Sequence, residues 1–190
     1  MARPRSEDKR NAILEAATEV VAEQGVSAPT ARIAKRAGVA EGSLFTYFEN
    51  KDALLNQLYL ELKSDLRQAM TGSFPAAERI AAQARYVWNA YVDWGVANPQ
   101  KRKAMNQLHV SDRITQQSKD AGMAGFAQIN AMMQESLASG VLKDQPPSFG
   151  PAIMASLAET TMEFILREPA LADRYKSAGF DAFWAAIAKA

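Results

Sequence analysis

The chain contains no cysteine, a single histidine and no long apolar run. The absence of cysteine excludes disulfide bonds, thiolate zinc sites and cysteine nucleophiles, and one histidine disfavours a histidine-rich metal site. No apolar stretch approaches the roughly 20 residues that a membrane helix needs, and the polar N-terminus leads into no signal-peptide core. We therefore expect a soluble, cytoplasmic protein that is not bound to a membrane and that carries no metal and no cofactor.

The chain also lacks a strong net charge, which is +1 over 190 residues. DNA-binding proteins usually present a strongly basic face, so this total does not indicate a nucleic-acid partner. The distribution is more informative than the sum. Four of the first ten residues are basic, and Arg32, Lys35 and Arg36 form a second short cluster. Local basic patches are therefore compatible with a nearly neutral total.

Apolar residues recur at helical spacing through almost the whole chain, and no segment alternates with the period of a strand. Glycine and proline interrupt this pattern where helices can end or begin. We predict an all-α protein whose first helices are short and whose later ones are long. About nine helices are expected near residues 7–24, 31–37, 42–48, 51–70, 75–97, 99–109, 112–139, 149–167 and 177–189, with a possible break near Gly122 and Gly125.

The segment from Thr30 to Phe48 fits two short helices that cross steeply. Thr30 is placed to cap the first helix, and Gly38 is suited to the turn because a left-handed residue is least costly as glycine. The inner positions are small or apolar, as a helix-turn-helix requires. These expected core positions are Ile33, Ala34, Ala37, Val39, Leu44 and Phe48.

Burial of those positions leaves a polar face on the second helix, which is the face that a recognition helix lays in the major groove. Its residues are Glu41, Gly42, Ser43, Thr46 and Tyr47. Lys51 begins the next helix, where its ammonium group and the helix amides suit a phosphate. An ordinary helical hairpin is the alternative, but the agreement extends over about 20 residues and includes capping, turn, core and exposed positions.

These motifs resemble those of the tetracycline-repressor (TetR) family. The resemblance is carried by ILEAATEVVAEQG from Ile13, by the Thr30 to Val39 pattern and by GSLFTYFENKDALL from Gly42. It implies an N-terminal three-helix DNA-binding domain over 1–50, joined by a linking helix to a helical ligand-binding and dimerisation domain over 51–190. It also implies that Ser43, Thr46 and Tyr47 contact bases or phosphates, and that Thr30 and Lys51 contact phosphates.

Phe45 departs from the family pattern, because members usually have a tyrosine there whose hydroxyl group contacts a phosphate. That contact is therefore lost here or transferred to Tyr47. The basic N-terminal residues Arg3 and Arg5 suit either an arm that enters the minor groove or a solvated terminus.

An aromatic stripe follows in the larger domain, with Trp88, Tyr91 and Trp94 at helical spacing. Such a stripe is compatible with a core or with the wall of an effector pocket, and family members bind small inducers between the equivalent helices. We assign an effector-binding set to Trp88, Tyr91, Trp94, Met105, His109, Phe126 and Met133. His109 and Asp112 flank Ser111, but neighbouring helical residues diverge, so we predict that the protein is not an enzyme.

The helix from Phe149 is apolar on two sides, which indicates burial on two sides. With the last helix it would form a four-helix homodimer interface, whereas complete burial within one subunit is the alternative. The predicted interface residues are Ile153, Leu157, Phe164, Phe180 and Trp184.

The sequence thus predicts a homodimeric repressor that binds palindromic double-stranded operator DNA and that a small-molecule effector releases. A DNA-binding regulator without such an effector is the first alternative, and a helical enzyme or lipid-binding module is the second.

Overall fold

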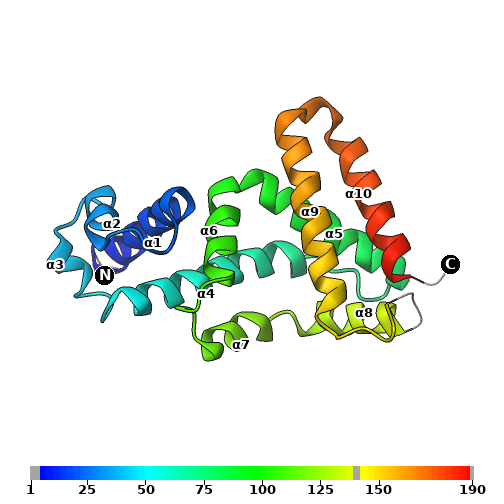
Figure 1. Ribbon diagram of the computed structural model, residues 1–190, viewed down its shortest axis with the longest axis horizontal. Helices are drawn as coiled ribbons and strands as arrows, with labels where there is room; N and C mark the ends of the chain where they lie inside the picture. The colour runs from blue at the N-terminus through cyan, green and yellow to red at the C-terminus, as the bar shows by residue number, and fades with distance from the viewer. Residues whose placement is uncertain (1–4, 139–141, 189–190) are drawn as a thin grey trace. The chain divides into compact units, whose positions relative to one another are not determined.

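The computed structural model describes residues 5–138 and 142–188, and those residues contain helices and no strand (Figure 1). This confirms the all-α class. The helices are α1 (Arg5–Gln24), α2 (Thr30–Arg36), α3 (Glu41–Leu44), α4 (Lys51–Thr71), α5 (Ile80–Ala97), α6 (Pro99–His109), α7 (Gln116–Ala124), α8 (Ala127–Ala138), α9 (Phe149–Arg167), the 3-10 turn η1 (Pro169–Leu171) and α10 (Ala172–Ile187).

Most predicted helix bounds agree with these within a few residues, and the predicted break near Gly125 separates α7 from α8. Two starts differ. Residues 75–79 form a turn that is closed by a hydrogen bond from the Glu78 amide to the Pro75 carbonyl (3.0 Å), so α5 begins at Ile80 instead of 75. In the last helix, η1 leads directly into α10, which therefore begins at Ala172 instead of 177.

Residues of the described structure form two compact units, and α4 contributes to both. Unit 1 comprises residues up to Asp65 together with Asn98–Ala124, and unit 2 comprises Leu66–Ala97 with the residues from Gly125 onward. Helix α6 belongs to unit 1 because it packs on α1. The predicted functional boundary at residue 50 remains a prediction, since compactness does not report function.

The core of unit 1 is built from aliphatic side chains of α1, α4 and α6. Burial of one such side chain contributes roughly 1.5–3 kcal/mol, so this set stabilises the unit. Its fully or almost fully buried members include Ile13, Ala17, Val20, Val21, Leu54, Leu55, Leu58 and Leu108. Several of them lie on the apolar face of α1 that was predicted from its spacing.

The core of unit 2 is aromatic and centres on Trp88 of α5. Its indole is fully buried and stacks on Phe183 of α10, with ring centroids 5.7 Å apart and planes 13° apart. The indole Nε1–H donates to the Lys176 carbonyl at 3.0 Å, so its polar atom is satisfied. Gly179 permits this approach, because a Cβ there would lie 2.7 Å from Trp88 Cζ2 and 2.3 Å from Thr161 Oγ1.

Helices α9 and α10 lie side by side in unit 2 (Figure 1). One row of α9 side chains is buried, namely Met154, Ala158, Met162 and Ile165. The neighbouring row is more exposed: Ile153 and Leu157 are half-buried and Phe164 is 40% exposed. The two apolar sides predicted for this helix are therefore a core side and a surface side.

None of the helices in the described parts of the chain is long and apolar enough to cross a membrane.

Candidate nucleic-acid interface

The turn between α2 and α3 is fixed by local backbone bonds. Gly38 adopts a positive φ of 67°, as predicted, and the Val39 amide donates to the Ala34 carbonyl at 3.0 Å. Ile33 and Ala34 are buried on one side of the turn, and Leu44 (0% exposed) and Phe48 (5%) are buried on the other. Four of the six predicted core positions are thus buried, whereas Ala37 and Val39 are half-buried. The buried side chains fix which residues of α3 face outward.

Helix α3 is shorter than the predicted 42–48, since it ends at Leu44. The chain continues in hydrogen-bonded turns, in which the amides of Tyr47 and Phe48 both donate to the Leu44 carbonyl at 3.0 and 3.1 Å. Gly42, Ser43 and Thr46 are exposed, as predicted, and Tyr47 is half-buried. The turn therefore keeps the expected face accessible although the helix is only one turn long.

Thr30 does not cap α2, contrary to the prediction. It is the first helical residue, and Pro29 occupies the N-cap position without a side-chain bond. The Thr30 hydroxyl instead donates to Glu41 Oε1 at 2.6 Å and so links the start of α2 to the start of α3. A hydroxyl group has one hydrogen to donate, so a phosphate contact by donation from Thr30 would require this bond to break.

Lys51 lies at the first position of α4, as predicted, and is half-buried. Partial burial, and then the positive charge of Arg113, lower the pKa of its ammonium group, while Asp52 opposes this shift. Asn50 caps the helix, because its Oδ1 accepts from the Ala53 amide at 2.8 Å. The sequence reasoning missed this cap, although asparagine directly before a helix is a strong signal for one.

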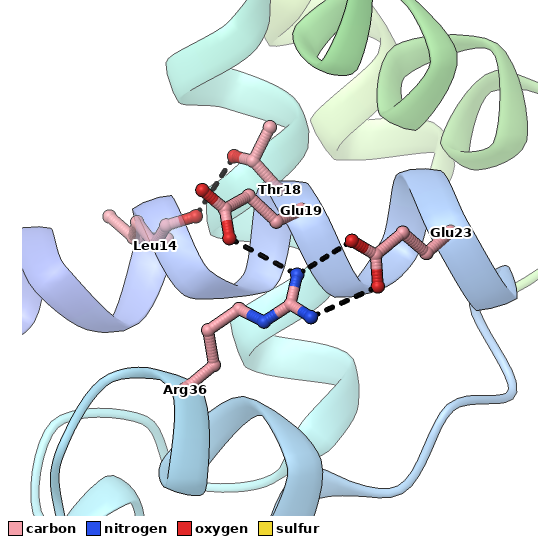
Figure 2. Close-up of polar contacts among 5 residues, drawn as sticks. All are labelled: Leu14, Thr18, Glu19, Glu23 and Arg36. Carbon is pink, nitrogen blue, oxygen red and sulfur yellow. Dashed lines mark hydrogen bonds and ion pairs between the residues drawn. The ribbon is translucent and has the colours of Figure 1, made fainter.

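Arg36 joins the hairpin to α1 through two carboxylates (Figure 2). Its guanidinium group makes a two-bonded contact with Glu23, at 2.8 and 3.1 Å, and donates to Glu19 at 3.1 Å. The hydrogen bond to Arg36 lowers the pKa of Glu23. Glu19 and Glu23 lie one helical turn apart, which was the available sequence signal for a shared cation.

A surface hollow of about 540 Å³ lies beside this clamp, and three of its lining residues are basic. It is lined by Val20, Gln24, Arg32, Lys35 and Arg36. The predicted basic cluster is thus confirmed as a group in space, although Arg36 is neutralised locally by its acidic partners. Arg3 lies outside the described residues, and the side chain of Arg5 is also outside them.

The predicted effector residues do not fall in one unit. Met105 and His109 belong to unit 1, and the other five belong to unit 2. Partial burial lowers the pKa of His109, and the charges of Lys63 and Lys119 lower it further. Tyr91 is half-buried, whereas Trp88, Trp94, Met105, Phe126 and Met133 are buried. Trp88 has a clear role in the core of unit 2, so the core explanation accounts for it.

The predicted dimer residues all lie on α9 and α10, but one of them, Phe180, is buried. Trp184 is half-buried and stacks on Phe180, with ring centroids 5.9 Å apart. Phe180 itself is 3% exposed and packs beneath the surface, where it also contacts Trp88 at a centroid distance of 6.4 Å. The structure therefore places Phe180 in the core and leaves Ile153, Leu157, Phe164 and Trp184 at the surface.

The N-terminal segment matches a known family model. Residues 13–58 match the model described as bacterial regulatory proteins of the tetR family. Over these residues the chain is similar to the TetR family. A crystal structure of a TetR-family transcription regulator from Shewanella sp. PV-4 is 29% identical, covers 96% of this chain and 99% of that one, and has a TM-score of 0.82.

Other relatives share less of the sequence. The uncharacterized HTH-type transcriptional regulator YhgD of Bacillus subtilis is 35% identical over 78 residues, which are 38% of this chain and 41% of that relative. The chain thus spans about two fifths of the length of this curated relative. The TetR-like regulator LfrR of Mycobacterium smegmatis, solved with proflavine, is 19% identical over 96% of this chain and 99% of that one, with a TM-score of 0.68.

Proposed function

We propose that this protein is a transcriptional repressor that binds palindromic operator DNA as a homodimer and that a small-molecule effector releases from the DNA. One observation carries the DNA-binding part. Buried Leu44 and Phe48 orient the hairpin so that Gly42, Ser43 and Thr46 are exposed together. A recognition helix uses such a face to reach base edges in the major groove.

The proposed DNA contacts are Gly42, Ser43, Thr46, Tyr47 and Lys51. Thr30, which was predicted to contact a phosphate, would have to release its bond to Glu41 in order to donate to one. The test is an electrophoretic mobility shift with the upstream region of the protein's own gene at low salt. Tyr47→Ala should weaken specific binding without changing the fold, as circular dichroism would verify. Tyr47→Phe serves as the matched variant and separates the hydroxyl group from the ring. Unchanged affinity in both variants would remove Tyr47 from the interface.

The homodimer is supported by the apolar surface of α9 and α10. Ile153, Leu157, Phe164 and Trp184 keep accessible apolar area on one helix pair, and apolar surface of this kind favours association. Two such subunits can set their recognition segments about 34 Å apart, which matches successive major grooves on one face of DNA.

Trp184→Glu should produce a monomer in sedimentation experiments. The matched control is Ala182→Glu, which adds the same charge to the same helix about 200° around its axis. A dimer that persists in Trp184→Glu, or that is lost equally in the control, would place the interface elsewhere.

An effector acts only through a difference in its affinity for the DNA-binding conformer and for the released conformer. Two observations support this part: the fold that the chain shares with LfrR, a protein solved with proflavine, and the half-buried Tyr91, which lies on α5 about one helical turn after Trp88. Operator release should be screened against a compound panel that includes proflavine. Tyr91→Ala should change the concentration that causes release while operator affinity without the compound stays the same. A panel that releases nothing would favour a regulator without a small-molecule effector.

A further inference from the structure

Glu41 is an acidic residue on the surface that is proposed to approach DNA. It is the first residue of α3, and its side chain is exposed. The residues at the N-terminal end of a recognition helix are the ones that meet base edges. The neighbouring Gly42 leaves this corner open, because a Cβ built there meets no atom within 4 Å.

The carboxylate of Glu41 is held in one direction. The Thr30 hydroxyl donates to Oε1 at 2.6 Å, across 11 residues of sequence. This length is typical of a charge-assisted bond between a hydroxyl group and a carboxylate. The bond occupies one oxygen and leaves Oε2 with capacity to accept a further hydrogen bond.

A carboxylate that enters the major groove needs a donor, since it is otherwise repelled by the phosphates and by the acceptors on the bases. Guanine presents two acceptors, and thymine presents an acceptor and a methyl group. Adenine presents a donor with the N7 acceptor beside it. Cytosine presents its N4 amino donor without an acceptor, and glutamate accepts from it.

We infer that Glu41 determines specificity by accepting a hydrogen bond from the N4 amino group of a cytosine in each operator half-site, and that Thr30 is the positioning residue that aims the carboxylate. This inference rests on the proposed operator binding. It assigns Thr30 a different role from a direct phosphate contact and gives the recognition face one base preference.

The experiment measures binding of the full-length protein to operators in which each half-site position is changed in turn to all four base pairs. For the wild-type protein, replacing the cytosine read by Glu41 should raise Kd by roughly 5- to 150-fold. Glu41→Ala should bind all four base pairs at that position within about threefold. Glu41→Gln should move the preference toward adenine, because the amide can pair with both N6 and N7.

Two further variants test the role of Thr30. Thr30→Val removes the donor and should reduce discrimination at that same position, whereas Thr30→Ser keeps a hydroxyl group and should restore it. Glu49→Ala is the charge control, because Glu49 is also exposed but lies after the turn. It should retain the wild-type base profile.

The inference is overturned if Glu41→Ala keeps the wild-type profile at every position, if the position it flattens does not prefer cytosine, or if Glu49→Ala flattens the same position. A wild-type protein that binds no operator would instead refute the proposed function. Circular dichroism of each variant establishes that it is folded, and Glu41→Gln offers a gain of adenine preference that an unfolded protein cannot produce.

Discussion

The recognition hairpin of unit 1 and the α9–α10 pair of unit 2 use apolar residues in different ways. In the hairpin a few buried side chains, Leu44 foremost, hold an outer face that is small and polar. On α9 and α10 apolar side chains occupy the core and the surface alike, with Phe180 inside and Phe164 outside. In the hairpin, residue type therefore separates the outer face, which is polar, from the core, which is apolar. On α9 and α10 both sides are apolar, so only the burial of each side chain separates the surface from the core.

The largest expected effect lies in the hairpin. Leu44→Ala should lower the free energy of unfolding by about 2–5 kcal/mol, because it removes a completely buried side chain from a very small core. Urea denaturation measures the change. Thr46→Ala, on the exposed face, is the control and should stay within about 0.5 kcal/mol of the wild type. Equal losses of unfolding free energy in the two variants would mean that Leu44 contributes no more to stability than a residue of the exposed face.

A smaller effect is expected in unit 2. Gly179→Ala should destabilise the protein by about 1–3 kcal/mol, because the added Cβ would lie too close to Thr161 and Trp88 and the aromatic core would have to shift. This cost opposes the gain in helix propensity that alanine normally brings. Thermal or urea unfolding checks it, with the exposed Ala178→Ser as control. A stabilised Gly179→Ala would mean that this core adapts more easily than its packing indicates.

Phe45 is an apolar residue on the face that is proposed to approach DNA. It is 44% exposed within the otherwise polar recognition face. Phe45→Tyr should strengthen operator binding by about 1 kcal/mol, roughly a fivefold lower Kd, if the new hydroxyl group reaches a phosphate. Fluorescence anisotropy with a labelled operator measures it. Phe149→Tyr adds the same hydroxyl group to a residue of α9 that is also 44% exposed and lies outside the proposed dimer set, so it should leave the affinity unchanged. A gain in both variants would contradict a local contact.

The smallest effect concerns the clamp of Arg36 on α1. The pKa of Glu23 is lowered from its usual 4.5, so the folded state favours the charged carboxylate. The contribution of this pair to stability is therefore fully present above pH 4.5 and is lost as the pH falls toward the lower folded pKa. The unfolding midpoint of Glu23→Gln should be slightly lower than that of the wild type at neutral pH, and the two midpoints should converge in acid. A difference that grows on acidification would contradict this sign.

The sequence predictions were more accurate for the recognition hairpin than for the aromatic region of unit 2. In the hairpin the turn glycine, the buried anchors Leu44 and Phe48 and the exposed face were predictable, because they follow from residue type and from apolar spacing along the chain. The bond between Thr30 and Glu41 and the Arg36 clamp were not, since each joins side chains of different helices. The start of α5 was misplaced because Pro75 suits a turn as well as a helix start.

For the aromatic stripe of α5, the sequence left two alternatives open, a role in the core and a role in the wall of a pocket. Periodicity establishes that Trp88, Tyr91 and Trp94 share a helical stripe, but it does not say what lies opposite them. The stacking of Phe183 on Trp88 assigned that residue to the core, and the burial of Phe180 removed it from the surface set.

The sequence by itself determined the helical class, the resemblance of the N-terminal segment to the TetR family and the polar face of the recognition hairpin. These are encoded by local spacing and by turn chemistry, which act over one or two helical turns. Only the tertiary structure decided which side of α9 is core, that Arg36 bridges to α1, and that the Thr30 hydroxyl group donates to Glu41 instead of capping its own helix. Those outcomes depend on which side chains meet across different helices, and that information is present only after the chain has packed.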